Sequence, residues 1–171
     1  MKIFSSISVI LLLLVSVTVA EEPKELSNAR AKYEHQKPSE AARVQYILEL
    51  KALRDKWAAA DKGELKWKLA DDEVKKHPVP ASVDTAVLKK LFVGRWRSPR
   101  HDYQYRANGS WVMLPVEEDA THGSWKIKGN QYWSDDRKYT ILLLDEKHFI
   151  FTDGEVVFYE SRLAGSNTTK N

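Results

Sequence analysis

The sequence predicts an α+β fold in which an N-terminal helical hairpin is followed by a small antiparallel up-and-down β-barrel or strongly bent sheet. Residues 26–74 are mostly helix formers, whereas apolar and polar side chains alternate from residue 92 onward. Two prolines within residues 77–82 separate these regions, because proline continues neither a helix nor a central strand. The chain of 171 residues therefore predicts one globular domain with a helical attachment.

Residues 1–20 have the features of a secretory signal peptide. Lys2 precedes an apolar run over residues 7–19, and Thr18 and Ala20 are the small residues that signal peptidase requires. We expect cleavage after Ala20, export to the periplasm or the extracellular space, and no membrane span after cleavage. A membrane anchor is the alternative, since the apolar run approaches the roughly 18 residues that a span needs.

Residues 21–76 predict the helical hairpin. Pro38 predicts a kink or a new helix start, and Asp61-Lys62-Gly63 predicts a turn before a second, shorter helix. Four apolar residues recur at spacings of four, three and four, and would form a stripe along one helix face: Tyr46, Leu50, Leu53 and Trp57. Such a stripe must pack against another surface.

Residues 77–90 predict a linker with a short helical turn, residues 91–163 the β domain, and residues 164–171 a disordered tail. The residues that alternation places on common faces are Tyr103 with Tyr105, Trp125 with Ile127, and Tyr139 with Ile141 and Leu143. The hairpin signals between the strands are Asn108-Gly109, Gly129-Asn130 and Asp153-Gly154. This spacing predicts about eight short strands in sequential hairpin order.

A short helical turn precedes Gly94-Arg95-Trp96, a run of hairpins follows, and Arg162 lies near the end of the last strand. With these features, residues 84–163 resemble a lipocalin-like, calycin-type barrel. The resemblance implies that Gly94 and Trp96 begin the first strand and that Arg162 stacks over Trp96 at the closed end. The whole layout is also similar to that of uncharacterised exported bacterial proteins, which implies no activity.

The β domain is rich in aromatic residues, five of which are candidate ligand-binding residues: Tyr103, Tyr105, Trp111, Trp125 and Trp133. Aromatic side chains that alternate inward fill a core, whereas rings on one exposed face can stack on a sugar or another flat ligand. An eight-stranded barrel has room either for side chains alone or for one small ligand. Both interpretations stay open at this point.

Composition and motifs disfavour several function classes. The formal net charge of +3 is too small for a nucleic-acid-binding surface, and the chain has neither cysteine nor a Gly-x-Ser-x-Gly motif. His101, His122 and His148 lie at separate hairpin positions without metal-ligand spacing. We therefore expect no catalytic residues, no metal and no cofactor.

The leading hypothesis is an exported, non-enzymatic protein whose lipocalin-like domain binds a small apolar or flat ligand. One alternative is an envelope interaction module in which the stripe of the helical hairpin recognises a protein partner. A second alternative is carbohydrate binding, which requires that at least two of the aromatic rings share a surface facing solvent.

Overall fold

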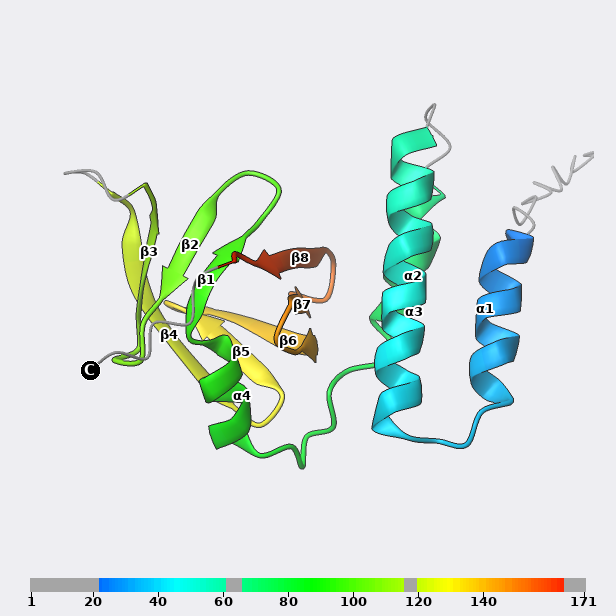
Figure 1. Ribbon diagram of the computed structural model, residues 1–171, viewed down its shortest axis with the longest axis horizontal. Coiled ribbons are helices and arrows are strands. Elements are labelled where there is room, and N and C mark those ends of the chain that lie inside the picture. Colours follow the sequence, from blue (N-terminus) through cyan, green and yellow to red (C-terminus); the bar gives the residue numbers. More distant parts are fainter. Residues whose placement is uncertain (1–21, 61–65, 116–119, 165–171) are drawn as a thin grey trace, which may run out of the picture.

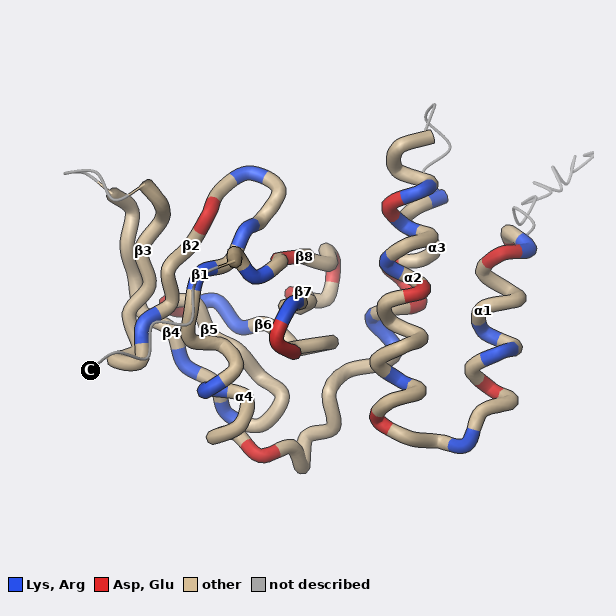
Figure 2. Tube along the Cα trace, in the orientation of Figure 1, with Lys and Arg blue, Asp and Glu red and all other residues tan. Residues whose placement is uncertain are grey.

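The computed structural model describes residues 22–60, 66–115 and 120–164. The predicted signal peptide, the turn at Asp61-Lys62-Gly63 and the predicted tail beyond residue 164 lie outside these ranges. The described chain forms a helical layer and a β-barrel that lie side by side (Figure 1). Lys and Arg are interspersed with Asp and Glu over both parts (Figure 2).

Three helices form the helical layer: α1 (Lys24–Glu34), α2 (Glu40–Ala60) and α3 (Trp67–Val74). Pro38 lies between α1 and α2, so the chain starts a new helix there instead of continuing through a kink. The Ser39 hydroxyl accepts a hydrogen bond from the Ala42 backbone N–H at 3.1 Å, which satisfies a free donor at the start of α2. None of the helices in the described ranges combines the length and the apolar content that crossing a membrane requires.

Eight antiparallel strands form the barrel: β1 (Gly94–Arg97), β2 (Asp102–Tyr105), β3 (Ser110–Leu114), β4 (His122–Lys128), β5 (Gln131–Ser134), β6 (Arg137–Leu144), β7 (His148–Thr152) and β8 (Val157–Arg162). Each strand pairs with the next, and β8 returns to β1 through the pairs Trp96–Arg162 and Arg97–Ser161. The predicted α+β fold with an up-and-down barrel is confirmed, and the sheet is closed.

A β-bulge in β6 corrects one expectation from alternation. Ile141 pairs with Phe151, but Leu143 pairs with Ile150, so the register shifts between them. The prediction that Leu143 shares a face with Ile141 is therefore wrong, because the extra residue turns Leu142 and Leu143 together toward the outside of the barrel.

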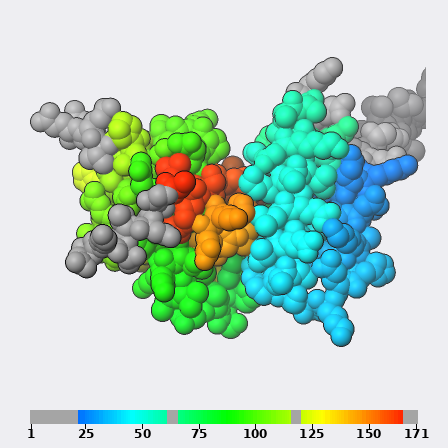
Figure 3. Space-filling model, in the orientation of Figure 1, coloured from blue at the N-terminus to red at the C-terminus, as the bar shows by residue number. Residues whose placement is uncertain are grey.

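This bulge creates the surface on which the helices pack. The outer side chains of Leu142, Leu143, Ile150 and Val157 form one buried cluster with apolar residues of α2 and α3. The predicted stripe lies in that cluster: Tyr46, Leu50 and Trp57 are buried, and Leu53 packs against them. The space-filling view shows the barrel and the helical layer in direct contact (Figure 3).

Polar contacts fix the orientation of the two parts. The Arg43 guanidinium donates hydrogen bonds to the backbone oxygens of Leu142, at 2.6 Å, and His77, at 2.8 Å. The Tyr159 hydroxyl donates to Asp71 on α3 at 2.7 Å. Because these groups are directional, they select one register of the helices on the barrel.

The short helix α4 (Thr85–Phe92) closes one end of the barrel. The Asp84 carboxylate caps the helix by accepting the Ala86 N–H, and Phe92 at the other end is completely buried in the barrel core. The Trp96 indole N–H donates to the Phe92 carbonyl oxygen at 2.8 Å. This hydrogen bond fixes α4 to the first strand.

A candidate ligand site inside the barrel

The strand register determines which side chains point into the barrel. Residues directly opposite in an antiparallel pair lie on the same face of the sheet. Following the pairs around the barrel from Trp96, the inward set includes these aromatic residues: Tyr103, Tyr105, Trp111, Trp125, Tyr132, Tyr139, Phe149, Phe151 and Phe158. The interior of the barrel is therefore predominantly aromatic.

The half of the interior next to α4 is tightly packed. The ring of Phe92 lies 4.2 to 5.1 Å, between centroids, from the rings of four buried aromatic residues: Tyr105, Trp125, Tyr132 and Phe149. The Arg162 guanidinium lies 4.3 Å from the centroid of the Trp96 ring and donates to the backbone oxygens of Leu91 and Val93. This half of the barrel holds a core.

Inward-facing aromatic residues toward the opposite end are only half-buried, and we call four of them the aromatic rim: Tyr103, Trp111, Tyr139 and Phe158. They form two perpendicular pairs, with ring centroids 5.8 Å apart for Tyr103 and Trp111 and 5.7 Å apart for Tyr139 and Phe158. Rings that face inward and still contact solvent are the surfaces that a flat or apolar ligand would cover.

Gly123 positions one member of the rim. A Cβ atom on Gly123 would lie 2.8 Å from Cε2 of Trp111 and 2.5 Å from Oδ1 of Asp135. Asp135, in the turn between β5 and β6, is itself held by the backbone N–H of Ser124, which it accepts at 2.7 Å. The absence of a side chain at Gly123 therefore lets the Trp111 indole lie against β4, next to this turn.

Between the aromatic rim and the packed half of the barrel, Glu160 points inward from β8, directly opposite Phe149. Glu160 is 6% exposed, and its Oε2 atom has no hydrogen-bond partner among the described residues. Burial raises the pKa of Glu160 to about 8, and an interaction with the Tyr105 hydroxyl lowers the pKa only in part. The carboxyl group is therefore mostly protonated and uncharged at pH 7.

Two neighbouring tyrosines respond to this acid. The pKa values of Tyr103 and Tyr105 are raised first by burial and second by the negative charge that Glu160 carries when it is ionised. The Glu160 carboxyl group is therefore close enough to both hydroxyls for its charge to act on them through a medium of low polarity.

The indole nitrogen Nε1 of Trp111 is a second buried polar atom without a partner in the described part of the chain. A buried donor or acceptor that lacks a hydrogen bond costs roughly 1–3 kcal/mol. Trp111 and Glu160 thus present one donor and one carboxyl group to the interior, and a molecule that pairs with them recovers part of this cost.

The predicted ligand-binding residues divide into three groups. Tyr103 and Trp111 lie on the aromatic rim, whereas Tyr105 and Trp125 belong to the packed half next to α4. Trp133 faces the outside of the barrel, where its ring lies 5.0 Å from the Lys126 ammonium and 5.8 Å from that of Lys138.

Sequence reasoning missed Tyr139 and Phe158 as rim residues and Glu160 as an interior acid. Both faces of β8 are covered, so the strand does not show a simple alternation of apolar and polar residues. A signal was nevertheless present, because an inward Arg162 implies by the period of two that Glu160 and Phe158 also point inward.

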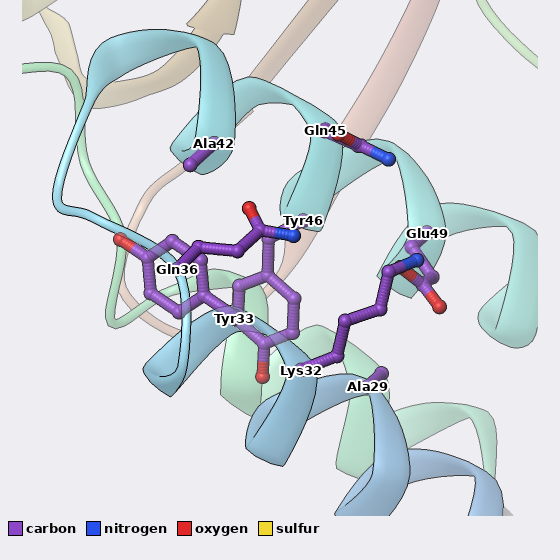
Figure 4. Close-up of a pocket in the computed structure, with 8 residues that line it drawn as sticks. All are labelled: Ala29, Lys32, Tyr33, Gln36, Ala42, Gln45, Tyr46 and Glu49. Carbon is purple, nitrogen blue, oxygen red and sulfur yellow. The ribbon is translucent and has the colours of Figure 1, made fainter.

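The helical layer holds only a shallow depression of about 160 Å³, part of which is open solvent (Figure 4). The rings of Tyr33 and Tyr46 stack there with centroids 4.5 Å apart, and Lys32 pairs with Glu49 at 3.0 Å. These contacts occupy its two aromatic rings and its two charged side chains. The described residues also contain no cluster of three His, Asp or Glu side chains that could hold a metal ion.

Comparisons with known proteins give no relative from which a role could be transferred. No family model matches the chain, and no significant similarity to a curated protein or a solved structure is found. The functional argument therefore rests on the geometry of the barrel interior.

Proposed function

We propose that this chain is an exported, non-enzymatic binding protein whose lipocalin-like barrel takes up one small apolar or flat ligand at the aromatic rim. The proposal rests on one observation: four aromatic rings point into the barrel and are nevertheless only half-buried. They belong to Tyr103, Trp111, Tyr139 and Phe158. Outward rings would be ordinary surface residues, and fully buried rings would be core.

The lipocalin-like assignment is supported by three features at the opposite end. The helix α4 precedes the first strand, Gly94-Arg95-Trp96 lies on that strand, and the Arg162 guanidinium covers the Trp96 ring. The barrel also closes with eight strands in sequential order. These features close one end and leave the rim as the part of the interior through which a ligand would enter.

The helical layer is proposed as a brace. It covers the outer apolar surface of β6 to β8, which would otherwise be exposed. The alternative of a protein partner that docks on the helical stripe loses its surface in this structure, because Tyr46, Leu50 and Trp57 are at most 8% exposed.

Carbohydrate binding remains the second candidate, since Tyr103 and Trp111 share the rim and are both half-buried. A sugar face can stack on such rings, but it also needs several polar partners. The rim offers few of these, which favours an apolar ligand. Titration with glucose or galactose, read by tryptophan emission, distinguishes the two candidates.

The test of the main proposal is a fluorescence titration with N-phenyl-1-naphthylamine, an uncharged flat probe. We expect saturable binding to the purified protein with one site. Trp111→Ala should weaken binding by about tenfold, because it removes a ring contact that contributes about 1.4 kcal/mol to the free energy of binding.

Trp133→Ala is the matched control, because it deletes the same side chain on the outside of the barrel. Its affinity for the probe should stay within about twofold of the wild type. The absence of saturable binding, or an equal loss in both variants, would overturn the proposal.

A further inference from the structure

Glu160 differs from the other buried acids of the described chain in having no cation. Glu73 pairs with Arg30 at 2.7 Å and Lys76 at 2.9 Å, and Asp71 accepts the Tyr159 hydroxyl with Arg54 nearby at 3.6 Å. No basic side chain of the described residues forms an ion pair with Glu160, although it is 6% exposed. The barrel therefore contains an acid whose positive partner is not supplied by these residues.

Arg162, two residues further along β8, does not fill this role. Its guanidinium stacks on Trp96 and donates to the backbone oxygens of Leu91 and Val93. These contacts hold it at the end of the barrel closed by α4. Its charge is therefore directed to the core and to α4, and Oε2 of Glu160 stays without a partner in the part of the chain that the structure describes.

The surroundings of Glu160 favour a positive charge. The faces of aromatic rings carry negative electrostatic potential and attract cations within about 6 Å of the ring centre. Tyr103, Tyr105 and Tyr132 lie close enough to respond to the charge of Glu160, and Tyr103 belongs to the aromatic rim. The electron-rich ring faces and the acid would repel an anionic ligand, so anionic ligands are disfavoured.

On the basis of the binding function proposed above, we infer that the ligand carries a cationic nitrogen, a protonated amine or a quaternary ammonium, which pairs with the carboxylate of Glu160 while its apolar part contacts the aromatic rim. The class of ligand is therefore a small amine with a flat or apolar body. The Trp111 indole N–H can donate to a hydroxyl or carbonyl group on that body.

Binding of such a ligand replaces the proton on Glu160 by the cationic nitrogen of the ligand. The uncharged carboxyl group of Glu160 releases its proton to the buffer, and the ligand nitrogen, which keeps its own protons, takes the place of that proton as the positive partner. No bond within the ligand forms or breaks. Because the carboxyl group is mostly protonated at pH 7, this exchange releases about one proton for each ligand bound.

The first experiment compares two probes of nearly equal size, 2-phenylethylammonium and 2-phenylethanol, as competitors of N-phenyl-1-naphthylamine. The ammonium group resembles that of lysine and is charged at neutral pH. We expect the ammonium to displace the fluorescent probe at about tenfold lower concentration than the alcohol. Equal potency of the two competitors would overturn the inference.

The second experiment repeats the competition with Glu160→Gln, which keeps the size of the side chain and removes its acid. The preference for the ammonium should disappear, while the affinities for N-phenyl-1-naphthylamine and 2-phenylethanol should stay within about twofold. Glu155→Gln is the matched control, since Glu155 is an exposed acid in the turn between β7 and β8. A preference that survives in Glu160→Gln contradicts the assignment.

The third measurement is calorimetry with 2-phenylethylammonium at pH 7 in two buffers of different ionisation enthalpy. The difference in heat should correspond to about one proton released by the wild type and to none released by Glu160→Gln. If the fluorescent probe binds but the ammonium is not preferred, the inference fails and the proposed function stands. If the fluorescent probe and both competitors fail to bind, both fail.

Discussion

Glu160 and Phe149 are direct partners across β7 and β8, so an acidic side chain and a completely buried phenyl ring share the inner face of the barrel. This pairing places a titratable group at the boundary between the packed core and the aromatic rim. A core position usually holds an apolar residue, because burying an acidic side chain costs free energy. Its presence there is the basis of the pH dependence and the ligand preference argued for this protein.

The stability of the protein should fall as the pH rises from about 4.5 to 8. The pKa of Glu160 is raised by burial from 4.5 to about 8, so the folded protein binds a proton that the unfolded chain has already released in this window. The free energy of unfolding then decreases with pH. Urea denaturation of the wild type and Glu160→Gln at pH 5, 7 and 9 measures this, and the variant should gain relative stability with each step.

Glu73 affects the stability of the protein in a lower pH range, so it does not obscure the effect of Glu160. Burial is the largest single influence and raises its pKa, but the hydrogen bonds from Arg30, Lys76 and His77 and the charge of Arg30 together outweigh burial and lower the pKa to about 2. The stabilisation by Glu73 is therefore complete above about pH 4.5 and is lost as the pH falls toward 2. Parallel pH profiles of the wild type and Glu160→Gln between pH 5 and 9 would contradict the prediction.

Arg162→Ala should destabilise the closed end of the barrel by about 2–4 kcal/mol. The substitution removes the contact with the Trp96 ring and the hydrogen bonds to the backbone oxygens of Leu91 and Val93. Urea denaturation followed by tryptophan fluorescence measures the loss. Arg97→Ala is the control, because the Arg97 guanidinium pairs with Asp102 on the exposed surface and should contribute little. Equal losses would contradict the closing role of Arg162.

Leu143→Ala should cost about 2–5 kcal/mol, because the substitution opens a cavity between the barrel and the helical layer. Leu143 is 1% exposed and lies in the cluster that joins β6 to α2 and α3. Leu69→Ala, the same substitution at a residue of α3 that is 38% exposed, is the matched control and should cost far less. Denaturant unfolding gives both values, and a similar cost at both positions would argue against the packing of the helices on the bulge.

Gly123→Ala should displace the Trp111 indole, because the new methyl group would lie 2.8 Å from the ring atom Cε2. The Asp135 carboxylate can rotate away, but the indole is rigid and must move as a whole. We expect a shift of tryptophan emission and a loss of affinity for N-phenyl-1-naphthylamine of about tenfold. Unchanged emission and affinity would show that Trp111 does not depend on the space at Gly123.

Much of the fold could be predicted from the sequence because local patterns determine it. The alternation at Tyr103 and Tyr105 and the turn at Asn108-Gly109 depend on backbone geometry within a few residues, and these patterns predicted the strands and their order. The stripe that contains Tyr46 and Leu50 likewise identified the buried face of α2 from helical periodicity alone.

The candidate site was harder to predict because it depends on which face of each strand is inside. Trp111 and Trp133 look equivalent in the sequence, yet the register places one on the rim and the other between two lysines on the outer surface. At Leu143 a bulge reversed the expected face, since one extra residue exchanges inside and outside for every side chain that follows.

The sequence by itself determined the two kinds of secondary structure, their order and the buried stripe of α2, because these follow from interactions between residues that are close along the chain. Only the tertiary structure decided that the sheet closes, that the helices cover β6 to β8, and that Glu160 lies inside with no ion pair to a basic side chain of the described residues. Burial and the lack of an ion-pair partner are properties of the assembled barrel, because they depend on contacts between segments far apart in the sequence.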